Sequence, residues 1–270
     1  MALVKAEGLV VRAMNLGETS KLVTLFTRES GILKVIAKAV RSNKSRMGAA
    51  LEPLTVARIV YYEKENRELQ FLSQAELVEF FPNLPANLEK WGYANACAEL
   101  VVRTQTSREA TEKLYPILLN TLRALNAPAS EGRVCFWAFQ MKLVGVLGVA
   151  PNLRRCLQCS AISPMAEPGS RSVYHFDISR GGFLCGNCAS GRSAHELSGE
   201  TLHLLAELQT LPAEKFSSFK ISPLARRETE NFFRAYFAFH LEEIGKLTAL
   251  KFVREVVGQA TPSGMASSVQ

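Results

Sequence analysis

Four cysteines stand in two closely spaced pairs near the middle of the chain. The first pair is Cys156 and Cys159, and the second pair, after 25 intervening residues, is Cys185 and Cys188. A spacing of two residues lets a turn aim both thiolates at one metal ion, and two such turns complete a tetrahedral all-sulfur site, which zinc favours. The gap is longer than the usual spacing of about fifteen to twenty residues. The pattern therefore predicts one structural zinc ion per chain, bound by these four side chains.

Two disulfides, or four unrelated buried thiols, are the alternatives for this quartet, and His175 or His195 could replace one thiolate. The chain begins without the apolar segment of a secretory signal, and its most apolar stretch, 134–150, is too short to span a bilayer. We therefore expect a cytoplasmic protein, in which thiols stay reduced and metal is favoured over disulfide. Four thiolates leave no open coordination position, so the site is predicted to be structural.

A second chemically active segment runs from Lys34 to Arg46 and holds five basic side chains and no acidic one. Cationic loops bind phosphate backbones because binding releases condensed counterions. The alternative is a solvated loop. The net charge of +7, with its excess in the N-terminal part and around the cysteines, favours a polyanionic partner. The predicted phosphate contacts are Lys34, Lys38, Arg41, Lys44 and Arg46, with Arg12 and Lys21 assisting.

Residues 1–80 must position these cations. They contain five β-branched or aromatic runs separated by Gly, Asn or Pro, at 8–13, 21–27, 32–38, 54–62 and 68–75. Five short strands in so few residues favour a closed barrel of the OB type, a fold that binds oligonucleotides. Tyr61, Tyr62 and Phe71 could stack on bases, although aromatic residues in such runs more often fill the core.

Residues 81–258 carry apolar side chains at helical spacing. The stretch that contains Val134, Trp137, Met141 and Val144 is apolar on most sides, which predicts a central helix. The cysteine quartet lies in an insertion, 152–195, between these helices. The expected fold is therefore a multidomain α+β protein: an N-terminal five-stranded OB-type β-barrel, then an α-helical domain with an inserted four-cysteine zinc ribbon. The tail, 259–270, is rich in Gly, Ser, Pro and Ala and is predicted to be disordered.

Several stretches together resemble the RecO family of DNA repair proteins. These are the segment from Gly17 to Gly31, the run Ala37-Lys38-Ala39-Val40-Arg41 with Ser45-Arg46 and Ala50-Leu51-Glu52-Pro53 after it, and the closing segment 241–255. The order of the elements is also similar. The chain departs from the family in having Ala39 where Gly is usual, which leaves the cations in place.

The resemblance implies a DNA-binding recombination mediator of the RecFOR pathway, acting in the cytoplasm at the nucleoid. Such proteins bind single- and double-stranded DNA and anneal complementary strands. With RecR, and in some pathways RecF, they load RecA onto strands coated by single-stranded DNA-binding protein. They dock on the acidic C-terminal tail of that protein through the helical domain.

An enzyme is the less favoured class for this chain. It contains neither a phosphate-binding Gly-Lys-Ser/Thr loop nor the His-x-Glu and Pro-Cys-x-x-Cys pattern of zinc deaminases. The stronger alternative is a zinc-ribbon transcription or translation factor that binds nucleic acid. Such a factor is expected to place its basic residues mainly in the ribbon, whereas here the longest acid-free basic stretch lies in the predicted barrel.

Overall fold

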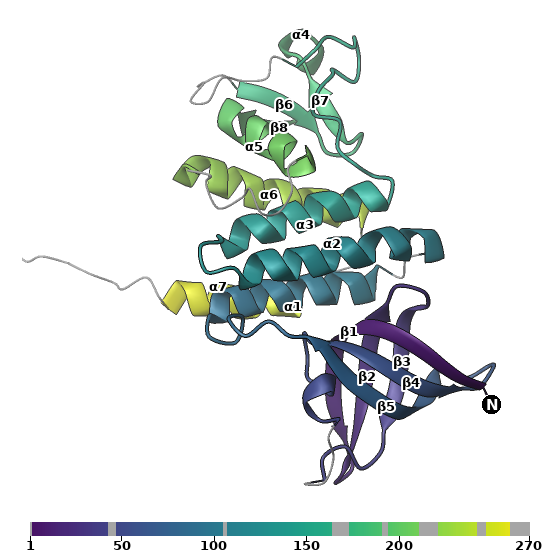
Figure 1. Cartoon of the computed structure of the whole chain (residues 1–270). Coiled ribbons are helices and arrows are strands. Elements are labelled where there is room, and N and C mark those ends of the chain that lie inside the picture. Colours follow the sequence, from purple (N-terminus) through teal and green to yellow (C-terminus); the bar gives the residue numbers. More distant parts are fainter. Residues whose placement is uncertain are drawn as a thin grey trace, which may run out of the picture.

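The structure is a computed structural model that describes residues 2–42, 47–104, 107–163, 173–190, 194–210, 221–241 and 247–259. A barrel lies at one end of the molecule, stacked helices form the middle and a small sheet lies at the other end (Figure 1). The predicted α+β architecture is confirmed. The segment 43–46, with the predicted contacts Lys44 and Arg46, lies outside the described residues.

Five strands form a closed barrel in the order β1-β2-β3-β5-β4, which is the OB arrangement. Neighbouring strands pair antiparallel except β3 and β5, which run parallel. All five predicted strands are present, and the first is longer than predicted. Their bounds, with the single turn of 3-10 helix η1, are β1 Ala2–Leu16, β2 Ser20–Thr27, β3 Gly31–Ala37, η1 Ala49–Leu51, β4 Val56–Glu63 and β5 Leu69–Glu79.

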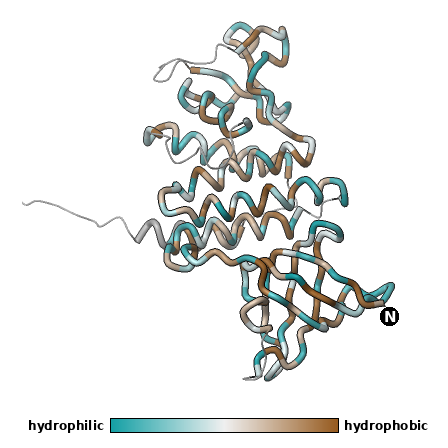
Figure 2. The backbone as a smooth tube through the Cα atoms, viewed as in Figure 1, coloured by the Kyte–Doolittle hydropathy of each residue, from teal (hydrophilic) through white to brown (hydrophobic). Residues whose placement is uncertain are grey.

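The helical part begins at Leu88 and stacks its helices in layers (Figure 1). Hydrophobic residues recur along these helices (Figure 2), and α3, which is buried along most of its length, lies at the centre as predicted. The bounds are α1 Leu88–Arg103, α2 Arg108–Asn126, α3 Gly132–Val146, α5 Gly199–Thr210, α6 Pro223–His240 and α7 Thr248–Gln259. The helix α7 includes Gln259, the first residue of the tail 259–270 that the sequence predicts to be disordered. The rest of this tail, 260–270, lies outside the described part of the chain.

The inserted segment folds as a three-stranded antiparallel sheet in the order β7-β6-β8. Its elements are β6 Val173–Asp177, β7 Gly182–Leu184, the short helix α4 Gly186–Ala189 and β8 His195–Ser198. The sheet packs on the helices through aromatic side chains. The ring of Phe176 lies edge-on to that of Phe232, 5.1 Å between centroids, and Tyr236 donates to the carbonyl of Val149 at 2.9 Å. The insertion therefore shares a core with the helical body.

The barrel shares a core with the helices as well. Leu9 and Phe26 belong to the same buried cluster as the side chains of α1 to α3, and Phe26 meets Tyr115 at a ring separation of 5.9 Å. At the rim of this contact Arg123 binds both carboxylate oxygens of Glu79, at 2.9 and 2.7 Å. The orientation of the barrel is therefore set by packing, with a paired guanidinium and carboxylate at its edge.

The closing helix α7 packs against α1. Both carboxylate oxygens of Glu99 accept hydrogen bonds at its start, from the backbone N–H groups of Thr248 and Ala249 at 3.0 Å each. A Cβ at Gly92 would lie 2.3 Å from Val253, so only glycine permits this approach. The end of the chain thus stabilises the first helix after the barrel.

Candidate metal centre and barrel face

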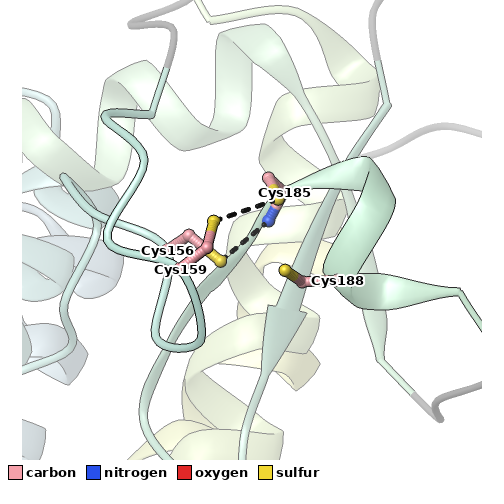
Figure 3. Close-up of side chains that lie close together, drawn as sticks. All are labelled: Cys156, Cys159, Cys185 and Cys188. Atoms are coloured by element: carbon pink, nitrogen blue, oxygen red, sulfur yellow. Dashed lines mark hydrogen bonds between the residues drawn. The ribbon is translucent and has the colours of Figure 1, made fainter.

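The four predicted cysteines come together in the structure. Their four sulfur atoms all lie within 4.8 Å of one another, and the Sγ atoms of Cys159 and Cys185 are 3.7 Å apart (Figure 3). A tetrahedral zinc with Zn–S bonds of about 2.3 Å sets its sulfurs about 3.8 Å apart. A disulfide needs an S–S distance of about 2.05 Å, and all four are free thiols. The donors and their spacing therefore suit one metal ion, and neither histidine belongs to the cluster.

Short backbone hydrogen bonds bring the two cysteine pairs together. We call the turn 156–159 the first knuckle. The backbone N–H of Leu157 in this turn donates to the carbonyl of Phe183 in β7 at 2.9 Å, and the backbone N–H of Asn152 just before it donates to the carbonyl of Gly181 at 2.8 Å. A Cβ at Gly182 would lie 2.6 Å from the side chain of Leu157. The absence of a side chain at Gly182 thus lets the first knuckle lie against the strand that leads to the second.

The surroundings of the sulfurs favour negative charge on Cys156. Burial acts to raise the pKa of this thiol, but backbone N–H groups, among them those of Cys159, Cys185 and Gln158, outweigh it and lower the pKa to about 6. At Cys188, hydrogen bonding to the Cys185 thiol and then burial raise the pKa to about 12. Adjacent sulfurs without a cation cannot all lose their protons at neutral pH, and a divalent cation would remove that conflict.

Three of the predicted cations lie on β3 and the turn that follows it. Lys34 is exposed on the outer side of β3, where it alternates with the buried Leu33 and Val35, and Lys38 is exposed at the first position after the strand. Lys34 faces Glu68 at 3.7 Å, an exposed pair of little energetic weight. Lys38 places its ammonium 4.7 Å from the ring centre of Phe71.

Arg41 has a structural partner as well as an exposed position. Its guanidinium donates to the carbonyls of Gly17 at 3.2 Å and Glu18 at 2.9 Å, in the turn between β1 and β2. Its backbone N–H donates to Thr19 at 2.9 Å. A guanidinium has five N–H donors, so others remain available for an anion. The cation therefore lies at the edge of the face formed by β2 and β3, which OB folds use for oligonucleotides.

The two assisting cations differ. Arg12 is exposed on β1, opposite Thr24 in the register. Lys21 is only 14% exposed and forms an ion pair with Glu52 at 2.6 Å.

The two adjacent tyrosines of β4 also differ in exposure. Tyr61 is buried at 2% exposure inside the barrel, whereas Tyr62 is 40% exposed on the outside.

One residue that the sequence reasoning missed is Gln70, which points into the barrel end and holds the loop between β4 and β5. Its amide accepts from the backbone of Lys64 and donates to the carbonyls of Lys64 and Arg67, at 3.0, 3.2 and 2.6 Å. The signal in the sequence is a glutamine between the apolar residues Leu69 and Phe71. An amide buried at such a position needs hydrogen-bond partners. The loop that borders the barrel face is thereby fixed.

The fold and the two sites define a class: an OB-barrel protein joined to a helical body with a ribbon that could bind a metal ion. Residues 1–81 match the family model "Recombination protein O N terminal", and residues 85–249 match "Recombination protein O C terminal". The chain therefore belongs to the RecO family, and this gives it a role in DNA repair and recombination.

Curated relatives agree with this assignment over nearly the whole chain. The DNA repair protein RecO of Pelotomaculum thermopropionicum is 35% identical over 90% of this chain and 91% of its own length. The RecO proteins of Roseiflexus sp. and Thermoanaerobacter sp. are 33% and 30% identical, over 98% and 90% of this chain and 90% and 94% of their own lengths. None of the helices in the described parts of the chain has the length and apolar character needed to cross a membrane.

Proposed function

We propose that this chain is a DNA-binding recombination mediator that anneals complementary strands and, with RecR, helps to load RecA onto single strands coated by single-stranded DNA-binding protein. The observation that carries the proposal is that Lys34 on β3 and Lys38 and Arg41 in the turn after β3 are all exposed. By sequence, Lys44 and Arg46 continue the same loop. Within the described residues, Arg12 adds a further exposed cation on the neighbouring strand β1.

The mechanism we propose is neutralisation of charge. Two single strands repel each other through their phosphates, and cations that neutralise phosphates lower this repulsion and release counterions. Strands held on such a face can then meet and pair without nucleotide hydrolysis. Exposed ion pairs such as Lys34 with Glu68 are weak and give way to a phosphate at little cost.

We propose that the cysteine quartet holds one Zn²⁺ per chain, bound by Cys156, Cys159, Cys185 and Cys188. Bound zinc would supply a cross-link between the two knuckles and no chemistry, because four thiolates saturate a tetrahedral ion. We therefore propose that the metal site is not catalytic and that the protein acts as a binding protein and not as an enzyme. Elemental analysis of protein purified without chelator is expected to give a stoichiometry near one, and a value near zero would refute this part.

The partners proposed beyond DNA follow from the family: RecR, and the acidic C-terminal tail of single-stranded DNA-binding protein, which would dock on the helical domain. A cytoplasmic, nucleoid-associated location follows from the same function. The boundaries we propose are 1–80 for the DNA-binding domain and 81–258 for the helical domain.

The deciding experiment is an annealing assay on complementary single strands with no nucleotide present. We expect annealing well above the spontaneous rate, decreasing as salt rises because the phosphate contacts are electrostatic. A second assay adds RecR and follows RecA assembly on strands coated with single-stranded DNA-binding protein. Annealing no faster than the spontaneous rate would contradict the proposal and favour the alternative, a transcription or translation factor that binds nucleic acid without annealing it.

A further inference from the structure

Apolar side chains form a continuous band around the outside of the closed barrel, beginning and ending on β1. Outward positions of a barrel strand that faces water are usually polar, because inward and outward side chains alternate. Here the strand register links outward apolar residues one after another, from Met14 to Leu22, Ile36, Phe71 and Tyr62 and on to Leu3. We call the residues Met14, Leu22, Ile36, Phe71, Tyr62 and Leu3 the outer band.

The band is accessible and does not belong to the barrel interior. Leu3, Met14 and Tyr62 are 61%, 45% and 40% exposed, and Leu22, Ile36 and Phe71 are partly exposed. Buried residues adjoin each partly exposed one along its strand: Val23 follows Leu22, Val35 and Ala37 flank Ile36, and Gln70 precedes Phe71, as alternation requires. Contiguous exposed apolar residues of this kind mark a binding surface.

Positive charge flanks the band on both sides along β3. Two residues before Ile36 stands Lys34, in a row that continues through Thr24 to Arg12. Two residues after Ile36 stands Lys38, with its ammonium over the ring of Phe71 at 4.7 Å. An apolar surface between cations matches a polymer that carries flat apolar groups and a negatively charged backbone.

We propose that the outer band receives the unstacked bases of a single DNA strand crossing the barrel, while Arg12, Lys34 and Lys38 hold its phosphates. The inference rests on the proposed DNA-binding function and adds which residues distinguish a single strand from a duplex. A duplex keeps its bases stacked inside and offers a protein mainly its backbone and groove edges. Aromatic rings, in contrast, stack on any unpaired base and tolerate every sequence.

The contact between Lys38 and Phe71 links the stacking of bases to the binding of phosphates. The Lys38 ammonium lies over a face of the Phe71 ring, and a base stacking on that face would take its place. A base that stacks on Phe71 displaces the ammonium of Lys38 toward solvent, where it can form an ion pair with a DNA phosphate. The effects of Lys38→Ala and Phe71→Ala on single-strand affinity should therefore be non-additive.

The test compares three probes of equal length: oligo-dT, the same strand with abasic sites in place of every base, and a duplex. Wild-type protein is expected to bind oligo-dT more tightly than the abasic strand. The variant Tyr62→Ala/Phe71→Ala should lose at least about fivefold in affinity for oligo-dT. Its affinity for the abasic strand and the duplex should change less than about twofold, and its salt slope should stay the same.

Leu77→Ala is the matched control, because Leu77 is an exposed apolar residue of β5 outside the band. Thermal unfolding of each variant checks the fold, and Tyr62→Ala alone is the second variant if the double variant unfolds. If wild type binds none of the probes, the DNA-binding function itself fails. If wild type binds but the variants keep the preference for oligo-dT over the abasic strand, the stacking proposal is overturned and the band is left for a protein partner.

Discussion

The cysteine cluster and the barrel face are two sites built in opposite ways. The cluster is compact, with all four sulfurs within 4.8 Å, and its ligands come from two short turns that local spacing specifies. The barrel face is spread over several strands, and its cations and apolar side chains become neighbours only through strand pairing. If the proposed functions are right, the closed cluster serves the stability of the chain and the open barrel face binds its partner. Mutations in the cysteine cluster should therefore lower folding stability, whereas mutations on the barrel face should lower DNA affinity.

The largest expected effect is loss of a metal ligand. Cys185→Ser should lower the zinc content and cost several kcal/mol of folding free energy, because structural zinc contributes about 10–16 kcal/mol in isolated zinc-finger peptides. Thermal unfolding and elemental analysis measure both. The buried Cys135 lies outside the cluster, so Cys135→Ala should leave the stoichiometry unchanged.

The second effect is confined to the barrel face. Lys38→Ala/Arg41→Ala should weaken single-strand binding and reduce the slope of log affinity against log salt by about 1.4, since each phosphate contact on a single strand contributes about 0.7. Fluorescence anisotropy over a salt series measures the slope. Arg227→Ala/Arg234→Ala removes the same charge from exposed positions of α6 and should leave the slope unchanged. Equal slopes for wild type and the Lys38/Arg41 variant would contradict the assignment.

A third change tests the turn beside the cations. Ala39 has φ +54°, in the left-handed region that costs an L-residue about 1–2 kcal/mol. Glycine adopts this conformation without that cost. Glycine also loses about 0.5–1 kcal/mol more chain entropy on folding. Relief of the strain exceeds this loss, so Ala39→Gly should raise the free energy of unfolding by the remainder, about 0.5–1 kcal/mol. Denaturant titration measures this change, and a destabilised variant would argue against the left-handed turn.

The smallest effect on DNA binding is expected at Lys21. Its ammonium is only 14% exposed and is paired with Glu52 at 2.6 Å, so it has little freedom to reach a phosphate. Lys21→Met should change the salt slope by less than about 0.3 while costing up to about 1 kcal/mol of stability. A slope change as large as that of Lys34→Ala would place Lys21 among the main contacts.

Much of the fold was predictable because its signals are local. Runs of β-branched and aromatic residues separated by Gly, Asn or Pro predicted five strands. Apolar residues at helical spacing predicted the central helix α3, which is buried along most of its length. The approach of the four cysteines also followed from two short spacings. The roles of Tyr61 and Tyr62 were not predictable, because adjacent residues of a strand face opposite sides and only the barrel decides which side is inside.

The sequence by itself determined the types of element, their order and the donor set of the metal site. These depend on backbone preferences and on contacts between residues close along the chain. Only the tertiary structure decided that Lys21 is paired, that Arg41 holds the turn between β1 and β2, and that six apolar residues align into one band. The physical reason is that a closed barrel fixes register between strands far apart in sequence, and register determines which side chains are neighbours.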